Sequence, residues 1–132
     1  MTEGQDKTST KAFAIAAARV AVERHCTDVC VMDLCGKSPA TDYFVICTGT
    51  SDRQMRTVAD EISQTARDMD QQRFGRAGYD QGRWILLDYV DVVVHIFDEE
   101  YRDYYDLELL WGDAERLEIS ATEGTEDTEK EA

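Results

Sequence analysis

The sequence predicts an α/β domain in which a small mixed β-sheet is flanked by helices. Helix-forming segments and short runs rich in Val, Ile and aromatic residues follow the order helix, strand, strand, helix, weak strand, strand, strand, helix. The 132 residues are 42% hydrophobic, which is enough for one core and too few residues for two domains. We therefore expect a single domain over residues 1–111.

The first half of the chain contains a helix and two strands. Residues 8–25 are rich in Ala and other strong helix formers, and hydroxyl side chains at the start of this segment can cap it. Residues 28–34 and 43–49 are mainly β-branched, aromatic or small apolar residues, and a loop with the only proline separates them. These two segments are the first two predicted strands.

A second helix is predicted from Ser51 onward. Ser51 and Gln54 have the spacing of a capping box, in which each side chain satisfies a backbone N–H at the helix start. Apolar residues then recur with a period near 3.6, which predicts one buried stripe. The members of this stripe are Met55, Val58, Ala59, Ile62, Ala66 and Met69.

The last elements are a weak strand, a hairpin and a helix. Residues 74–79 predict an edge strand, and residues 84–89 and 92–97 predict the hairpin. A final helix is expected over residues 99–111. Within it we expect Tyr101, Tyr105 and Leu109 to be packed, and Tyr104 and Trp111 to reach the surface.

The charge of the chain restricts its partners. The formal net charge is −14, and residues 112–132 hold eight acidic and two basic residues with few large apolar side chains. We interpret residues 112–132 as an acidic, disordered tail. One alternative function is that of an adaptor whose tail recruits basic proteins. An acidic chain is repelled by phosphate, so we expect a basic protein partner, with no direct nucleic acid readout and no membrane.

The four cysteines do not predict a metal site. Their spacing lacks the second pair that zinc modules need, so we expect neither metal nor cofactor. The N-terminal residues are polar, and no apolar run is long enough to cross a bilayer. We therefore expect a cytoplasmic protein whose thiols are reduced.

Catalytic patterns are incomplete. The Gly49–Ser51 segment ends a strand and opens a helix, where backbone N–H groups could hold a phosphate. A nucleotidyltransferase also needs two carboxylates directed at one metal ion, but Asp88 and Asp91 are three residues apart with a turn between them. Cys47 with His95 is a weaker nucleophile–base pair, because apolar neighbours raise a thiol pKa. We predict no catalytic residues, with nucleotide binding at Gly49–Ser51 as the alternative.

Strand alternation assigns the hairpin side chains to two faces. Ile85, Leu87 and Tyr89 form the better core face, so Trp84 and its neighbours should point to solvent or a partner. With a turn centred on Tyr89 and Val90, the expected cross-strand pairs are Asp88 with Asp91, Leu86 with Val93 and Trp84 with His95. The aspartates could simply cap the turn. The same Trp, His and acid set is also typical of a docking site for a basic partner.

Longer stretches make the chain resemble the Iojap-like ribosomal silencing factor family. They are "TDYFVICTGTSDRQMRTVADEI", "GRWILLDYVDVVVHIFDEEYRDYYDLELLW" and the following "GDA". The resemblance implies a nucleotidyltransferase-like fold without catalytic residues. It also implies a translation regulator that binds the large ribosomal subunit on its intersubunit face, through the ribosomal protein numbered fourteen. Such a factor blocks small-subunit joining when nutrients are scarce, and family members often form homodimers.

The expected docking residues combine the hairpin with the final helix. They are Trp84, Leu86, Asp88, Asp91, His95, Tyr104 and Trp111. Two positions depart from the family pattern: Ala77 stands before Gly78 where glutamate is usual, and Val90 stands in the hairpin turn where glycine is usual. Because valine tolerates positive φ badly, we expect a turn of a different type here.

Overall fold

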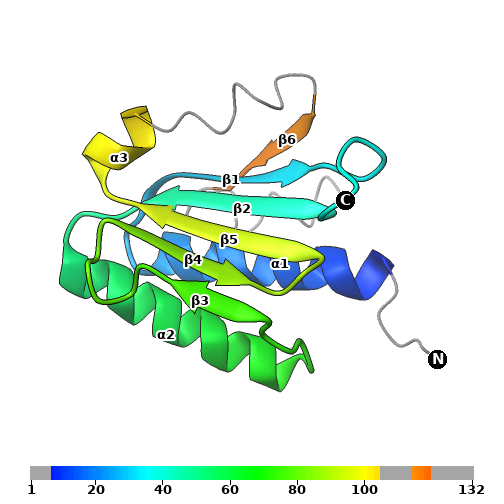
Figure 1. Ribbon diagram of the computed structural model, residues 1–132, viewed down its shortest axis with the longest axis horizontal. Helices are drawn as coiled ribbons and strands as arrows, with labels where there is room; N and C mark the ends of the chain where they lie inside the picture. Colours follow the sequence, from blue (N-terminus) through cyan, green and yellow to red (C-terminus); the bar gives the residue numbers. More distant parts are fainter. Residues whose placement is uncertain (1–6, 105–113, 120–132) are drawn as a thin grey trace.

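A computed structural model describes residues 7–104 and 114–119 of the chain. The described part is a six-stranded sheet with helices, and its strands run in the order β3-β4-β5-β2-β1-β6 (Figure 1). The elements in chain order are α1 (Lys7–Glu23), β1 (Thr27–Asp33), β2 (Tyr43–Thr48), α2 (Asp52–Asp68), β3 (Gly75–Ala77), β4 (Trp84–Asp88), β5 (Val92–Phe97), α3 (Glu99–Tyr104) and β6 (Glu115–Glu118).

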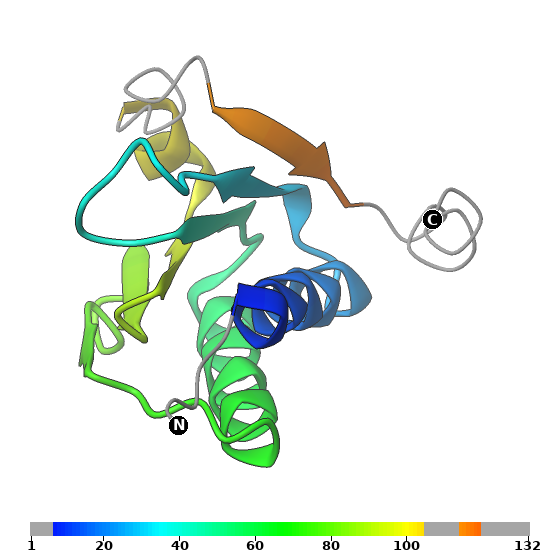
Figure 2. The same ribbon diagram turned by 90° about the vertical axis from the view of Figure 1, so that its right-hand side faces the viewer.

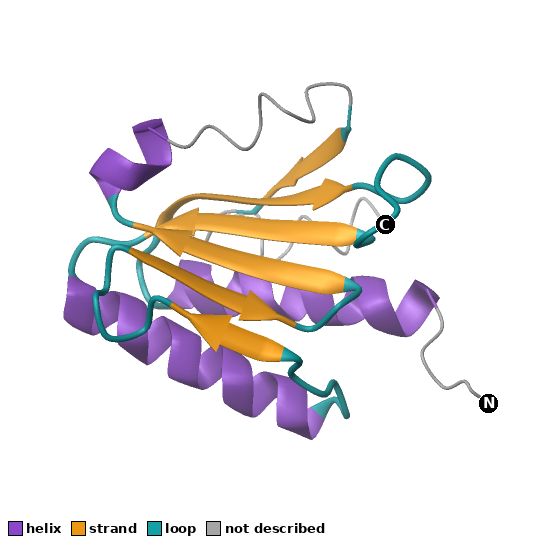
Figure 3. Cartoon of the chain, in the orientation of Figure 1, coloured by secondary structure: helices purple, strands orange, loops and turns teal. Residues whose placement is uncertain are grey.

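The sheet is mixed because one of its pairings is parallel. β2 and β5 lie side by side and run in the same direction, whereas every other neighbouring pair is antiparallel. A parallel pair needs a crossover connection, and here the connection from β2 to β5 includes α2, β3 and β4 (Figure 3). The predicted fold class, a mixed sheet flanked by helices, is confirmed.

Both long helices cover the same face of the sheet (Figures 1 and 2). The main core lies between them and the strands, and it includes Phe13 from α1, Ile62 from α2 and Leu87 from β4, each fully buried. α1 presents alanines to this core, and small side chains allow a helix to approach closely. The other face of the sheet is not covered by either long helix.

The start of α2 has the predicted capping box, except that the Gln54 side chain accepts from the N–H of Thr50 and not from that of Ser51. The Ser51 hydroxyl accepts the Gln54 backbone N–H at 3.0 Å, and Ser51 is the N-cap. The Gln54 side chain accepts from the Thr50 backbone N–H at 2.6 Å and donates to the Arg24 carbonyl at 2.6 Å. The cap therefore also joins the start of α2 to the end of α1.

The predicted tail is wrong for one segment. Residues 115–118 form β6, which pairs antiparallel with β1 and places Leu117 opposite Val31. The sequence did not indicate this strand, because three of its four residues are charged and its stability comes from a distant partner. Residues 112, 113 and 120–132, together with the second half of the predicted final helix, lie outside the described residues.

The hairpin register differs from the expected one. Leu86 lies opposite His95, whereas the sequence-based register paired it with Val93. The turn is centred on Val90 and Asp91 and not on Tyr89 and Val90, since the Tyr89 N–H binds the Val92 carbonyl at 2.9 Å. The resulting shift is two residues, and an even shift keeps every side chain on its predicted face.

Val90 adopts the conformation that its side chain disfavours. Its φ is 71°, and the Asp91 N–H binds the Tyr89 carbonyl at 2.8 Å across it, which makes a γ-turn. The premise behind the expected change of turn type, that valine avoids positive φ, is wrong at this position. The Asp88 carboxylate accepts the Val90 N–H at 2.8 Å and helps to hold this turn.

We expect Val90→Gly to stabilise the domain. Valine at positive φ costs about 1–2 kcal/mol, and the entropy that glycine adds to the unfolded chain offsets only part of the relief. Val90 is half exposed, so little packing is lost. Chemical denaturation should show a net gain of about 1 kcal/mol. Val90→Ala is the control, because it removes the β-branch and keeps a Cβ; an equal gain from both variants would refute strain relief at φ.

Candidate docking surface

The face of the sheet that α1 and α2 leave uncovered contains the predicted docking residues of the hairpin. Trp84, Leu86 and Asp88 are partly exposed on this face, and they alternate along β4 with the buried Ile85 and Leu87. The alternation follows from the pleat of a strand, which sends successive side chains to opposite faces. The predicted division of the hairpin into a core face and an outer face is therefore confirmed.

Four rings meet on this uncovered face. Trp84 stacks on Phe97 with ring centroids 5.0 Å apart, and Phe44 meets His95 edge-on at 4.6 Å. His95 lies 6.0 Å from both Trp84 and Phe97. We call Phe44, Trp84, Leu86, His95 and Phe97 the aromatic face.

A hydrogen bond orients the two polar rings of the aromatic face. The Trp84 Nε1–H donates to His95 Nδ1 at 3.2 Å, which assigns the imidazole proton to Nε2. His95 is only 4% exposed, and its Nε2 has no hydrogen-bond partner among the described residues. Burial lowers the pKa of the His95 imidazole to about 4, so the ring is neutral at physiological pH.

Trp84 has a structural role that the sequence did not predict. It points away from the main core as expected, but it packs against a second cluster that includes Met32, Ile46 and Phe97. The expectation that Trp84 points to solvent or a partner therefore holds only in part, because the side chain also packs within the protein. Truncating Trp84 removes packing as well as any partner contact, so a neighbouring residue is the better probe of docking.

The predicted pair of carboxylates does not form a cluster across the strands. Asp88 lies opposite Val93, and its carboxylate accepts the Val90 N–H, so it caps the turn as the simpler interpretation held. The backbone carbonyl of Asp91 accepts the N–H groups of Asp42 and Tyr43 at 2.9 and 3.0 Å. This contact ties the hairpin turn to the start of β2.

Helix α3 is attached beside the aromatic face. Asp98 accepts the Tyr101 N–H at 2.7 Å as an N-cap, and Arg83 binds Asp98 at 2.8 Å while lying over the Tyr101 ring at 4.6 Å. Tyr101 is partly buried against the second cluster, as predicted. The side chains of Tyr104 and Trp111, and the positions of Tyr105 and Leu109, lie outside the described residues.

The sequence reading missed three aromatic residues near this surface. Phe97 follows His95 by two residues, so alternation alone could have placed it on the same face. Phe44 could not be found locally, because its contact with His95 depends on the parallel pairing of β2 with β5. Phe74 is 76% exposed beside the hairpin turn, where its N–H binds the Asp88 carbonyl at 2.7 Å.

The Gly49–Ser51 segment lines a separate pocket of about 590 Å³. Two of its backbone donors are already engaged: Gly49 N–H binds the Phe97 carbonyl at 2.7 Å, and Thr50 N–H binds the Gln54 side chain. Asp52, Asp98 and Glu99 also line this pocket. The arrangement matches a well-capped helix start better than a phosphate cradle, because anions are disfavoured beside carboxylates.

The described residues show no other constellation suited to catalysis. Cys47 packs in the core under the helices while His95 lies on the opposite face, so the two cannot act on one substrate. The hydrogen bond that Cys47 donates to Cys26, together with burial, raises the pKa of the Cys47 thiol. No group of three potential metal ligands occurs within residues 7–104 and 114–119, and no helix there is long and apolar enough to cross a membrane.

Comparison with known proteins identifies the family. The family described as "Ribosomal silencing factor during starvation" matches residues 7–132, which is nearly the whole chain. The chain belongs to this ribosomal silencing factor family. The resemblance proposed from the sequence motifs is thereby confirmed.

Relatives of this silencing factor occur in bacteria and in chloroplasts. The chain is 43% identical over 98 residues to the ribosomal silencing factor of Bacillus subtilis, covering 74% of this chain and 83% of that protein. It is 33% identical over 120 residues to the chloroplastic Iojap protein of Zea mays, covering 89% of this chain and 51% of that one. A crystal structure of a Chromobacterium violaceum protein matches with a TM-score of 0.73 at 29% identity, covering 82% of this chain and 88% of that one.

We expect the burial of His95 to make the stability of this silencing factor depend on pH. Its folded-state pKa of about 4 lies below the ordinary value of 6.5, so the unfolded chain binds the proton first. The free energy of unfolding should fall as pH drops through this window, by on the order of 3 kcal/mol in total. His95→Gln keeps an acceptor for the Trp84 N–H, so denaturation curves of this variant should show a smaller loss.

His25→Asn is the matched control for this pH experiment. His25 is the other histidine of the chain and is exposed, and asparagine tolerates its φ of 74°. The control should retain the pH dependence of the wild type. Parallel stability curves for His95→Gln and the wild type between pH 6.5 and 4 would show that the buried imidazole does not cause the loss.

Proposed function

We propose that this silencing factor docks through its aromatic face onto the intersubunit face of the large ribosomal subunit. Its contact there is the ribosomal protein numbered fourteen, and occupancy sterically blocks small-subunit joining, so that translation falls when nutrients are scarce. The observation that supports docking is the partly exposed set of Trp84, Leu86 and Phe44 on a face that neither long helix covers. Aromatic anchors in a pre-ordered cluster are typical of interface hot spots.

Charge supports a basic protein as the partner. The chain carries 28 acidic against 14 basic residues, and Asp88 and Asp91 border the aromatic face at the hairpin turn. Complementary charge accelerates encounter and fixes orientation, whereas nucleic acid would be repelled. Ala77 stands opposite Leu86 at the edge of this face, so the glutamate usual at this position in the family is missing from the rim.

The proposed mode of action needs neither cofactor nor catalysis and takes place in the cytoplasm. Binding alone excludes the small subunit, because two bodies cannot occupy one surface. The family resemblance also suggests a homodimer, which analytical ultracentrifugation would detect as a doubled mass. Co-sedimentation with isolated large subunits, and not with joined ribosomes, is the direct test of the proposal. Saturable micromolar nucleotide and magnesium binding without subunit binding would favour the alternative at Gly49–Ser51.

We expect Leu86→Ser to weaken large-subunit binding roughly tenfold or more, because it removes an apolar contact from the centre of the aromatic face. Leu117→Ser is the matched control, since Leu117 is a partly exposed strand leucine on the opposite face, near the other edge of the sheet. Co-sedimentation titrations measure both affinities, and thermal melts confirm folding. Equal losses of affinity in the two folded variants would show that the aromatic face is not part of the interface.

We also expect binding to weaken as salt rises, because screening reduces the attraction between acidic and basic surfaces. Asp88→Asn should flatten this salt dependence while the turn is kept, since the amide oxygen can still accept the Val90 N–H. Asp68→Asn is the control on the exposed side of α2, where Asp68 accepts from Gln64. Association rates across a salt series give the slopes. A steeper or unchanged slope for Asp88→Asn would show that this carboxylate does not contribute.

A further inference from the structure

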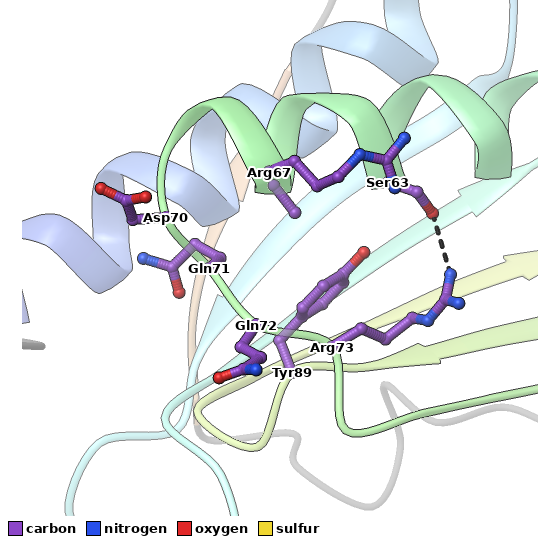
Figure 4. Close-up of a pocket in the computed structure, with 8 residues that line it drawn as sticks. Ser63, Arg67, Asp70, Gln71, Gln72, Arg73 and Tyr89 are labelled. Carbon is purple, nitrogen blue, oxygen red and sulfur yellow. Dashed lines mark hydrogen bonds between the residues drawn. The ribbon is translucent and has the colours of Figure 1, made fainter.

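A second pocket lies on the helix side of the sheet, away from the aromatic face. It has a volume of about 580 Å³ and opens between the end of α2, the following residues 70–73 and the last residue before the hairpin turn (Figure 4). This volume lies within the range of small-molecule sites. Its polar lining consists mainly of Ser63, Arg67, Asp70, Gln71, Arg73 and Tyr89.

Tyr89 supplies a buried polar group to this pocket. Its side chain is 6% exposed, and its ring packs edge-on against Phe13 with centroids 4.9 Å apart. The hydroxyl has no hydrogen-bond partner among the described residues. In Figure 4 it points towards the side of the pocket where Ser63, Arg67 and Arg73 lie. A buried hydroxyl normally has a partner, so a ligand atom near this side would satisfy it.

The two arginines of the pocket have only neutral hydrogen-bond partners. Arg73 Nη1 donates to the Ser63 hydroxyl at 3.3 Å, and Arg67 Nη2 donates to the Gln64 side-chain oxygen at 2.9 Å. Within residues 7–104 and 114–119, neither guanidinium forms an ion pair. Elsewhere in this part of the chain Arg24, Arg56 and Arg83 all bind carboxylates. The lining therefore holds two guanidinium groups against one carboxylate, that of Asp70, although the chain as a whole is strongly acidic.

Hydrogen bonds satisfy part of the negative charge at the end of α2. Helix C-terminal carbonyls carry partial negative charge, but those of Ala66 and Arg67 accept the N–H groups of Gln71 and Asp70 at 2.8 and 3.2 Å. Asp70 adopts a φ of 59° to close this cap. Its side chain lies across the pocket from Ser63 and Arg73 (Figure 4). The donors are thus collected on one side, and the carboxylate lies on the other.

We propose that this pocket binds the phosphate group of a small-molecule ligand. The guanidinium groups of Arg67 and Arg73 can pair with its charged oxygens, and the Tyr89 hydroxyl can donate to another. The Ser63 hydroxyl donates to the Ala59 carbonyl at 2.8 Å, so its part is to accept from Arg73 and hold that guanidinium in place. Two guanidinium groups, each with several N–H donors, together with one hydroxyl match a phosphate, with three or four acceptor oxygens, better than a carboxylate with two. Because Tyr89 faces the helices and the aromatic face lies on the opposite side of the sheet, the site is independent of ribosome docking.

Isothermal titration of the full-length chain with inorganic pyrophosphate, at physiological ionic strength, tests the proposal. Saturable binding with one site per chain is expected, together with a raised melting temperature. Succinate serves as the carboxylate probe and should bind much more weakly. If pyrophosphate gives no saturable heat, water alone satisfies Tyr89 and the proposal fails. Equal affinity for succinate would overturn the assignment to phosphate.

Variants locate the site. Arg73→Gln should weaken pyrophosphate binding roughly tenfold or more, whereas Arg53→Gln, on the exposed first turn of the same helix, should not. Asp70→Asn removes the opposing charge, keeps a residue that tolerates positive φ, and should strengthen binding. Equal losses for Arg73→Gln and Arg53→Gln would indicate non-specific attraction and overturn the site.

Tyr89→Phe gives an independent readout, because it removes the hydroxyl and keeps the ring against Phe13. Without ligand its melting temperature should equal or exceed that of the wild type, since an unpartnered buried group is removed. With pyrophosphate its thermal shift should be smaller than that of the wild type. A lower melting temperature without ligand, combined with unchanged affinity, would mean that the hydroxyl serves the fold and not the ligand.

Discussion

The two long helices cover only one face of the six-stranded sheet, and most other features of the domain depend on this constraint. The covered face must be apolar on every central strand. This accounts for the buried Val45 of β2, Ile85 of β4 and Val94 of β5. The uncovered face is then free to hold side chains that a closed core would not accept. A histidine, a tryptophan with a polar edge and an aspartate all lie there.

On this uncovered face, order comes from contacts between rings. Trp84 is held by stacking on Phe97 and by its hydrogen bond to His95. Phe44 of β2 packs edge-on against the His95 imidazole. Such a cluster has lost most of its rotamer freedom before any partner arrives, which lowers the entropic cost of binding. The same packing buries His95, and burial keeps its imidazole neutral at physiological pH.

Two groups of arginines in this acidic chain have different surroundings. Arg83 joins β4 to the start of α3 through Asp98 and Glu100, and Arg24 links the end of α1 to α2 through Glu61. Arg67 and Arg73 instead flank a pocket that also contains a buried tyrosine hydroxyl. An ion pair that lies on the surface contributes little stability, so the first group mainly fixes geometry. The second group leaves charge available to a ligand.

The sequence by itself determined the elements from α1 to α3 and the face that each hairpin side chain takes, because capping and strand alternation are local properties. Ser51 starts a helix, and Leu86 lies on the outer face whichever register the hairpin adopts, as an even shift preserves the faces. Only the tertiary structure decided that Phe44 meets His95, that β6 joins the sheet, and that Tyr89 opens into a pocket with two arginines. These contacts join residues far apart in the chain, and their stability arises from packing that no local pattern records.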